Sequence, residues 1–162
     1  MLALHQPVAT DLRRIAAVLK INSDLERMAD LAVNIAERAL RLGELPFTAV
    51  PEKLQRMTDV TTEMVRQCLE AFFKLDVRQA RRVCRRDDDV DRLNAEIIQE
   101  LIQVMRSDPE KIEPALQLFS ATRHLERIAD HATNIAEDVI YLAEGAIVRH
   151  RPEAIRECDE KH

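Results

Sequence analysis

The 162-residue chain has few of the residues that build turns, aromatic cores or disulfides. It contains two glycines and no tryptophan, and its aromatic content is 3%. A compact β fold would need many more glycine-centred turns, so this class of fold is disfavoured. The three cysteines, Cys68, Cys84 and Cys158, are odd in number and widely spaced, which fits neither a disulfide framework nor a C-x-x-C metal site. This cysteine usage favours a reducing, cytoplasmic location.

Long apolar runs and an excess of basic residues are also missing. No apolar run approaches the ~18 residues that a membrane span needs. The start of the chain, MLALHQPVATDLRR, lacks the basic segment and the long apolar core of a signal peptide. A net charge of −5 argues against a general nucleic-acid binder, because neutralising phosphates requires a basic surface. We expect a soluble protein that reaches a membrane only through partners and does not bind nucleic acid.

What the chain does contain is typical of long helices. A third of its residues are charged, with Leu, Ala, Arg and Glu abundant. Apolar residues recur at steps of three and four, and this spacing predicts helices over residues 8–42, 51–75, 77–106 and 109–144. Gly43 and the linker ELPFTAVP end the first helix, and Asp108 and Pro109 of SDP separate the last two. Gly145 is expected to end the last helix, before a frayed polar tail.

One 13-residue phrase occurs twice, a hundred residues apart. Residues 25–37 read LERMADLAVNIAE and residues 125–137 read LERIADHATNIAE, with ten of the thirteen positions identical. Each copy carries two carboxylates four residues apart, Glu26 with Asp30 and Glu126 with Asp130. Residues i and i+4 lie on one face of a helix, where like charges repel. A single pair of this kind is expected by chance, but its recurrence at the same positions of both copies indicates a role for these carboxylates.

The residues around these carboxylates indicate a neighbouring helix. Small residues recur in both copies: Ala29, Ala32, Ala36, Ala129, Ala132 and Ala136. Small side chains allow close helix approach, and carboxylates drawn into such an interface must be paired, protonated or bound to a cation. Arg27 and Arg127 follow the glutamates directly, which places them about 100° around the helix. A cation is therefore the better counter-charge.

The third predicted helix supplies a partner for the second copy. Asp87 and Asp91 are again four residues apart, and the tight SDP turn makes the last two helices antiparallel. About 17 residues separate Asp91 from the turn and about 18 separate the turn from Glu126, so the acid pairs should meet at similar height. Asp87, Asp91, Glu126 and Asp130 would then offer oxygen ligands for Mg²⁺, Mn²⁺, Ca²⁺ or iron. The alternative is a solvated acidic seam with diffuse counterions.

These residues carry a resemblance to the PhoU family of phosphate-uptake regulators. The matching stretches are DLERMADLAVNIAERAL, RHLERIADHATNIAEDVIYLAEG, HQPVATDLRRIAAVLKI and SDPEKIEPALQLF. The resemblance implies an all-α, PhoU-like antiparallel helix bundle built from two tandem three-helix repeats. It also implies that the E/D-x-x-x-D motif of each repeat binds a multinuclear iron or zinc centre. The motif corresponds here to Glu26/Asp30, Asp87/Asp91 and Glu126/Asp130.

The resemblance further implies regulation without catalysis. Proteins of this family are cytoplasmic, restrain the phosphate-specific ABC transporter through its ATPase, and keep a phosphate-sensing histidine kinase in its signal-off state. The sequence shows no phosphate-cradling loop and no nucleophile–base pair, so we predict no enzymatic activity. A metal-free helical adaptor remains an alternative. A ferritin-like di-iron enzyme is disfavoured, because no glutamate has histidine three residues later.

Four further polar residues lie within or beside the repeated phrase. His124 and His131 are replaced in the first copy by Asp24 and Leu31. Each could be a peripheral metal ligand or a surface residue, and the surface role is favoured. Asn34 and Asn134 recur one turn beyond the carboxylates. They could hydrogen-bond to metal ligands or pack between helices.

The spacing of the two copies predicts the domain organisation. About 74 residues separate Pro51 from the second copy, whereas only 24 precede the first copy. We therefore expect residues 1–43 to be the last helix of an incomplete first repeat, 44–50 a linker, 51–146 a complete repeat and 147–162 a tail. Glu26 and Asp30 then form only a half-site with weak metal affinity.

The first helix also raises the question of oligomeric state. It should carry an apolar stripe, formed by Leu12, Ile15, Leu19, Met28 and Ile35, that is larger than a soluble monomer usually exposes. Two arrangements would cover the stripe. The helix could pack as a fourth helix on its own unit, or it could pair with a second chain, even by exchange of this helix. The homodimer is the favoured expectation.

Overall fold

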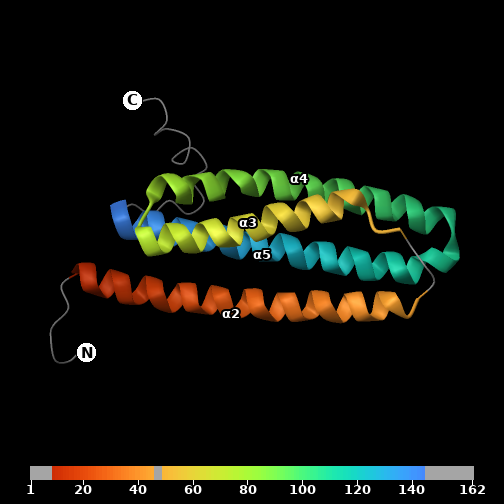
Figure 1. The fold of residues 1–162 in the computed structure, drawn as a ribbon, viewed down its shortest axis with the longest axis horizontal. Coiled ribbons are helices and arrows are strands. Elements are labelled where there is room, and N and C mark those ends of the chain that lie inside the picture. The colour runs from red at the N-terminus through yellow and green to blue at the C-terminus, as the bar shows by residue number, and fades with distance from the viewer. Residues whose placement is uncertain (1–8, 46–48, 145–162) are drawn as a thin grey trace.

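The described part of the protein is built from four long helices and one short 3₁₀ turn. The structure is a computed structural model that describes residues 9–45 and 49–144. With labels as in Figure 1, the elements are α2 (Ala9–Gly43), α3 (Glu52–Lys74), α4 (Val77–Ser107), η1 (Pro109–Lys111) and α5 (Ile112–Glu144). The described residues form no strand, so the all-α prediction is confirmed. The first three helices begin and end within one residue of the predicted bounds, while Gly145 and the tail lie outside the described residues.

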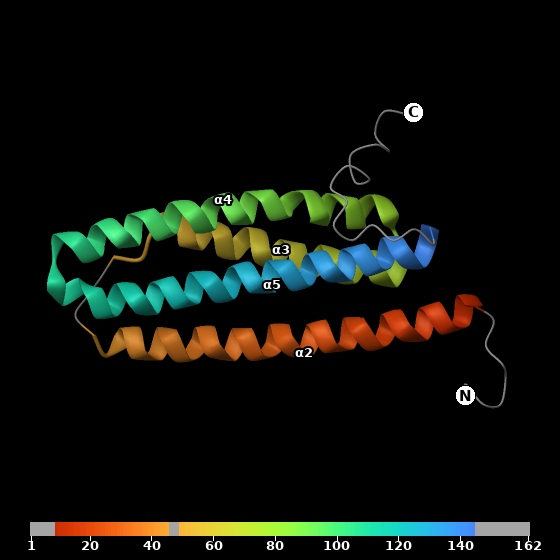
Figure 2. The same ribbon diagram turned by 180° about the vertical axis from the view of Figure 1, so that it is seen from behind.

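The central element is α5, which is covered on two sides. On one side it packs against α3 and α4, which also pack against each other, and on the other side it packs against α2 (Figures 1 and 2). Consecutive helices run antiparallel. Among the described helices, α2 packs against α5 alone. The outer side of α2 is therefore not covered by any described element.

The core lies between α3, α4 and α5. Its largest fully buried side chains include Met57, Met64, Val83, Val90, Ile97, Leu101, Ile135, Val139 and Ile140. Most of them are four or seven residues apart along each helix, which places them on one face, and burying that face supplies most of the helices' stability. None of the described helices has an apolar stretch long enough to cross a membrane.

A Schellman-type turn connects α3 to α4. Leu75 takes the left-handed conformation with φ 51°, and the backbone N–H of Asp76 donates to the carbonyl of Ala71 at 3.0 Å, which is the bond expected at such a helix end. The Asp76 carboxylate then accepts a hydrogen bond from the backbone N–H of Gln79 at 3.0 Å. One residue therefore ends α3 and caps the first turn of α4.

Replacing this cap is expected to weaken the fold measurably. Asp76→Ala removes the acceptor for a helix-terminal N–H and should lower the free energy of unfolding by about 1 kcal/mol. The matched control is Asp76→Asn, which keeps the acceptor and should stay within a few tenths of wild type. Urea unfolding followed by circular dichroism distinguishes the two. Equal losses in both variants would mean that the carboxylate charge matters and the capping bond does not.

The turn between α4 and α5 follows its prediction. The Asp108 side chain accepts a hydrogen bond from the Glu110 backbone N–H at 3.1 Å, and Pro109 takes the first position after it. The first turn is 3₁₀, and α5 begins at Ile112. This tight connection makes α4 and α5 antiparallel neighbours.

The position of α2 corrects one expectation. Met28 is buried against α5, but Leu12 and Leu19 are 52% and 67% exposed. The predicted stripe is therefore not a single face, because its members lie on two sides of the helix. Of the two arrangements considered, the structure has α2 as a fourth helix on its own chain. The homodimer stays a prediction.

Polar contacts fix the register of α2 on α5. Lys20 Nζ lies 2.5 Å from the buried carboxylate of Asp138, and the guanidinium of Arg13 lies 5.3 Å from the ring centre of Tyr141. Nearer the other end, Arg38 donates to the Gln117 side chain at 3.4 Å.

Candidate metal centre

The four predicted carboxylates of the second copy lie along the seam of α4 and α5. Asp87 and Asp91 come from α4 and Glu126 and Asp130 from α5. Asp87 and Glu126 are half-buried, and Asp91 and Asp130 are on the exposed side. The two pairs act on each other across the seam: the charge of Asp130 reaches Asp87, and the charge of Asp91 reaches both Asp130 and Glu126. The antiparallel turn thus brings the two acid pairs to similar height.

Burial and mutual repulsion make the seam costly to ionise. Burial raises the pKa of Asp87 to about 6, and the nearby charges of Asp130 and Asp91 add to the effect. Burial also raises the pKa values of Glu126 and Asp130, each with a contribution from Asp91 across the seam. Groups shifted in this way favour either a proton or a cation.

Basic groups beside the seam offset part of this effect: the charges of His131, Arg123 and Arg127 act to lower the pKa of Asp130. Arg123 Nη1 forms an ion pair with Glu126 at 2.7 Å. The Thr133 hydroxyl favours the ionised form of Asp87, although it makes no hydrogen bond of good geometry with any described residue. Among the residues that the structure describes, no three Asp, Glu, His or Cys side chains form a cluster tight enough to hold a metal ion. The seam presents the donor atoms, and a bound ion would require these side chains to close around it.

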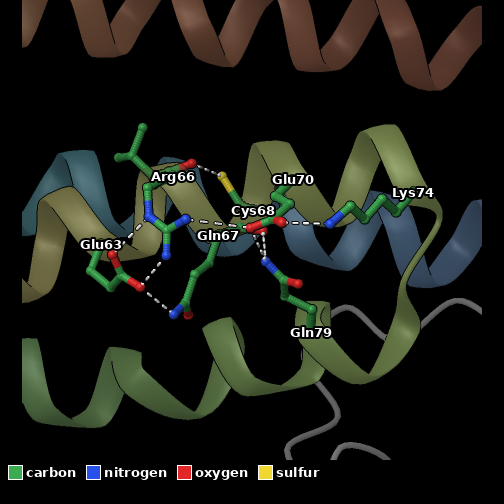
Figure 3. Close-up of polar contacts among 8 residues, drawn as sticks. Glu63, Arg66, Gln67, Cys68, Glu70, Lys74 and Gln79 are labelled. Atoms are coloured by element: carbon green, nitrogen blue, oxygen red, sulfur yellow. Dashed lines mark hydrogen bonds and ion pairs between the residues drawn. The ribbon is translucent and has the colours of Figure 1, made fainter.

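The acidic residues of α3 are in the opposite situation (Figure 3). Arg66 donates to Glu63 at 2.7 and 2.9 Å, and this hydrogen bonding lowers the pKa of Glu63 to about 2. Lys74 lies 2.6 Å from Glu70, and Gln79 of α4 donates to the same Glu70 carboxylate at 3.2 Å. Acids with basic or amide partners are thus stabilised in the charged form, whereas the seam acids are destabilised in it. The seam therefore differs from the acids of α3 in that its charged form is disfavoured.

Metal-free protein is expected to lose stability as the pH rises through the range in which Asp87 ionises. The folded-state pKa of about 6 lies above the ordinary value of 3.8, so the native state holds more protons than the unfolded state between these pH values. Stability then falls as pH rises from about 4 to about 6. Since water reaches part of the side chain and screens its charge, we expect a loss of about 1–2 kcal/mol.

The measurement is urea unfolding at several pH values in the presence of a chelator. Asp87→Asn should flatten the decline, and Asp59→Asn, on the exposed surface of α3, should leave it unchanged. A wild-type curve that rises over this range would contradict the assignment.

The first copy of the phrase has a different environment. Glu26 and Asp30 are exposed on α2, and so are Ala29, Ala32 and Ala36. The expectation that both acid pairs face a helix is therefore wrong for this copy among the described residues, because no described helix covers that side of α2. Glu26 and Asp30 lie on the side of α2 that no described helix contacts. The half-site with weak metal affinity stays a prediction.

The histidines require a second correction. The surface role expected for His131 is wrong, because the side chain is buried and its Nδ1 lies 2.8 Å from a carboxylate oxygen of Asp24 on α2. Because a carboxylate only accepts, the ring donates this bond. His131 therefore joins α5 to α2. His124 is half-buried, and its Nδ1 has no hydrogen-bond partner among the described residues. Burial, followed by the nearby positive charges of Arg38 and Arg127, lowers its pKa.

The asparagines and cysteines complete the set of polar residues considered for the centre, and the role of Asn34 and Asn134 beside metal ligands stays a prediction. Asn34 and Asn134 are both half-buried. Cys68 and Cys84 are buried free thiols, and burial raises the pKa of each to about 12, so neither is available as a thiolate ligand at neutral pH. The sequence reasoning missed Asp24, Lys20 and Asp138 as a group that ties α2 to α5. The sequence gives no sign of these contacts, because the paired residues lie more than a hundred positions apart along the chain.

The fold and the facing carboxylate pairs define the protein as a helical bundle with a candidate cation site. Comparison with known proteins identifies the family to which such a bundle belongs. The family model of the PhoU domain matches residues 1–39 and 54–139. A phosphate-specific transport system accessory protein PhoU homolog from Aquifex aeolicus is 46% identical over 151 residues, covering 93% of this chain and 68% of the relative. The corresponding protein from Deinococcus radiodurans is 42% identical over 146 residues, covering 90% of this chain and 68% of the relative.

Solved structures agree. The crystal structure of PhoU from Pseudomonas aeruginosa superposes with a TM-score of 0.86 at 40% identity, covering 90% of this chain and 70% of that one. The phosphate transport system regulatory protein PhoU from Streptococcus pneumoniae gives a TM-score of 0.81 at 31% identity, covering 90% of this chain and 69% of that one. The chain belongs to the PhoU family. The resemblance inferred from the repeated phrase is confirmed.

Proposed function

We propose that the chain regulates phosphate homeostasis as an accessory protein of a phosphate-specific transport system. It limits phosphate uptake and holds Pho-regulon signalling off when phosphate is plentiful. The observation that carries this proposal is the identity of 42–46% with accessory proteins of such systems over at least nine tenths of the chain. The chain spans about two thirds of the length of these relatives, and the proposal transfers their role to the part that is shared.

The protein acts by docking in the cytoplasm. Its partners are the ATPase of the phosphate ABC transporter and the phosphate-sensing histidine kinase, and it reaches the membrane only through them. The resemblance of the repeated phrase to the regulators of this family supports these partners. The proposed role includes no catalytic turnover.

The carboxylate seam is the proposed metal site. Asp87, Asp91, Glu126 and Asp130 supply oxygen donors only, which suit hard cations such as iron, Mg²⁺, Mn²⁺ or Ca²⁺, and zinc also accepts carboxylate ligands. A bound ion would supply the positive charge that relieves repulsion between α4 and α5. The residues of the chain contribute the donors on two facing helices, and the raised pKa of Asp87 supports their fit to a cation.

A pull-down tests docking and metal together. Tagged protein is presented with the transporter ATPase and, separately, with the kinase, each with added metal and with chelator. We expect retention of both partners and a loss of retention with chelator. The matched control is Glu26→Gln/Asp30→Asn, which alters the exposed half-site only. Retention that chelator leaves unchanged would favour the metal-free adaptor, and no retention under any condition would contradict the docking function.

The same preparation tests the absence of turnover. Phosphatase or nucleotidase activity that persists through purification, and disappears when Asp87 and Asp130 are replaced, would show that the protein is an enzyme. We expect the activity to remain at background in wild type and variant alike.

A further inference from the structure

A shallow groove lies between α3 and α4, two consecutive helices that α2 does not contact. Its volume is about 540 Å³, which is within the range of small-ligand sites. Six residues line it, two from α3 and four from α4: Glu63, Gln67, Arg82, Arg85, Arg86 and Asp89. The four members on α4 are three, four and seven positions apart, so they form one stripe along that helix. The groove is therefore a feature of the α3–α4 hairpin alone.

Three arginines make this groove basic on a chain whose net charge is −5. Arg82 and Arg85 are exposed, and Arg86 is half-buried. Arg82 and Arg86 are four residues apart, a spacing at which like charges repel on a helix. Within residues 9–45 and 49–144, no carboxylate forms an ion pair with either of these two guanidinium groups. An anion bound between them would relieve the repulsion.

The two carboxylates of the groove are already paired with other side chains. Glu63 accepts hydrogen bonds from Arg66 at 2.7 and 2.9 Å and from Gln67 Nε2 at 2.5 Å (Figure 3). Asp89 accepts a hydrogen bond from Arg92 at 2.7 Å. With Arg66 and Arg92 included, five arginines stand against two carboxylates, an excess of three positive charges. The acids of the groove thus leave its positive charge largely in place.

The composition and the length of the groove favour linked phosphate groups. Every basic residue that lines it is an arginine, whose planar guanidinium binds phosphate oxygens in pairs. Arg82 to Arg86 spans one helical turn, about 6 Å. Asp89 follows at one end, and at the other end Gln79 bridges the helices by donating to Glu70 at 3.2 Å. Such a short basic stretch suits two or three phosphate groups and is too short for an extended acidic polymer.

We propose that this groove binds a compact oligophosphate, pyrophosphate or triphosphate, through the guanidinium groups of Arg82, Arg85 and Arg86. Arg82 and Arg86 lie one turn apart and hold neighbouring phosphate groups, while Arg85 adds a third positive charge. None of the lining residues is aromatic, so the groove offers no ring on which a nucleotide base could stack. The four acids of the carboxylate seam do not line the groove, and the inference is independent of the metal site and of the regulatory partners.

Isothermal titration calorimetry with pyrophosphate tests the site. The full chain is first dialysed against chelator and then against plain buffer, so that no ion at the seam can bind the anion. Wild type should bind one pyrophosphate per chain. Arg82→Gln/Arg86→Gln should weaken binding about a hundredfold, because each charge-assisted contact that is lost costs about tenfold or more. Its helical circular dichroism should match that of wild type, since both side chains lie at the surface.

A matched control removes the same charge elsewhere. Arg56→Gln/Arg106→Gln changes exposed residues of the same two helices, outside the groove, and should bind pyrophosphate as wild type does. No binding by wild type at millimolar pyrophosphate, or an equal loss in the two double variants, would overturn the proposal.

A charge-preserving variant separates phosphate recognition from attraction by charge. Arg82→Lys/Arg86→Lys keeps both charges but loses the planar forks, so it should bind pyrophosphate about tenfold more weakly than wild type. Citrate and a polyglutamate peptide should also bind at least about tenfold more weakly than pyrophosphate, and ATP should bind no more tightly than triphosphate. Equal affinity in the lysine variant or for citrate would mean that charge alone attracts the anion. Tighter binding of ATP or of the peptide would indicate a nucleotide or protein site. Each of these results would contradict the proposal.

Discussion

Replacing Asp87 and Asp130 together by asparagine is expected to stabilise the metal-free protein and to abolish its response to metal. In wild type, two charged groups that repel each other are held together by the packing of α4 on α5. Neutral amides of similar shape remove that repulsion, and we expect a gain of about 1–2 kcal/mol at neutral pH. Added metal at a hundred times its dissociation constant should stabilise wild type by about 2.7 kcal/mol.

The melting temperature shows both effects in one series. For a chain of this size, the metal should raise the melting temperature of wild type by about 5–10 °C, and it should leave the double variant unchanged. The control is Glu26→Gln/Asp30→Asn, whose carboxylates are exposed on α2 and which should keep nearly all of the metal response. A double variant that still gains the full increase would show that the ion binds elsewhere.

The second large effect comes from comparing the two copies of the repeated phrase. Ala132 is fully buried in α5, whereas its counterpart Ala32 is exposed on α2. Ala132→Leu forces three extra carbon atoms into packed space and should cost about 1–3 kcal/mol. Ala32→Leu adds the same atoms in solvent and should change the free energy of unfolding by no more than about 0.5 kcal/mol.

Urea unfolding of the two variants side by side provides the measurement. The immediate neighbours differ, Leu31 and Val33 against His131 and Thr133. Because the substitution is the same in both helices, the helix propensity of leucine cancels between the variants, and a difference reports the surroundings. A loss of similar size in both variants would mean that the outer side of α2 is covered as tightly as α5 is.

The helices could be predicted closely because the chain marks their ends with strong local signals. Gly43, Asp76 and the Asp108–Pro109 pair act through backbone geometry and capping bonds within a few residues, which is information that a sequence contains directly. The meeting of Asp87 and Asp91 with Glu126 and Asp130 followed from the same cause. The short turn makes α4 and α5 antiparallel, so counting residues from the turn along each helix gives the positions that lie opposite each other.

The two faces of α2 could not be separated from sequence alone. Leu12 and Met28 both belong to apolar patterns at helical spacing, but one pattern is buried against α5 and the other is exposed. When a helix is apolar on two sides, the pattern does not say which side the rest of the chain covers. The contact between His131 and Asp24 could not be predicted for the same reason. It depends on how α2 aligns with α5, and two polar residues do not indicate that alignment.

Metal content is the most direct test of the central claim that the seam of α4 and α5 binds a cation. Protein purified without chelator is dialysed against metal-free buffer, and its metals are counted by inductively coupled plasma mass spectrometry. Wild type and Glu26→Gln/Asp30→Asn should both retain at least one equivalent of metal per chain, and Asp87→Asn/Asp130→Asn should retain none. Full occupancy in the last variant, or no metal in wild type after reconstitution with iron, zinc, manganese, magnesium or calcium, would contradict the account.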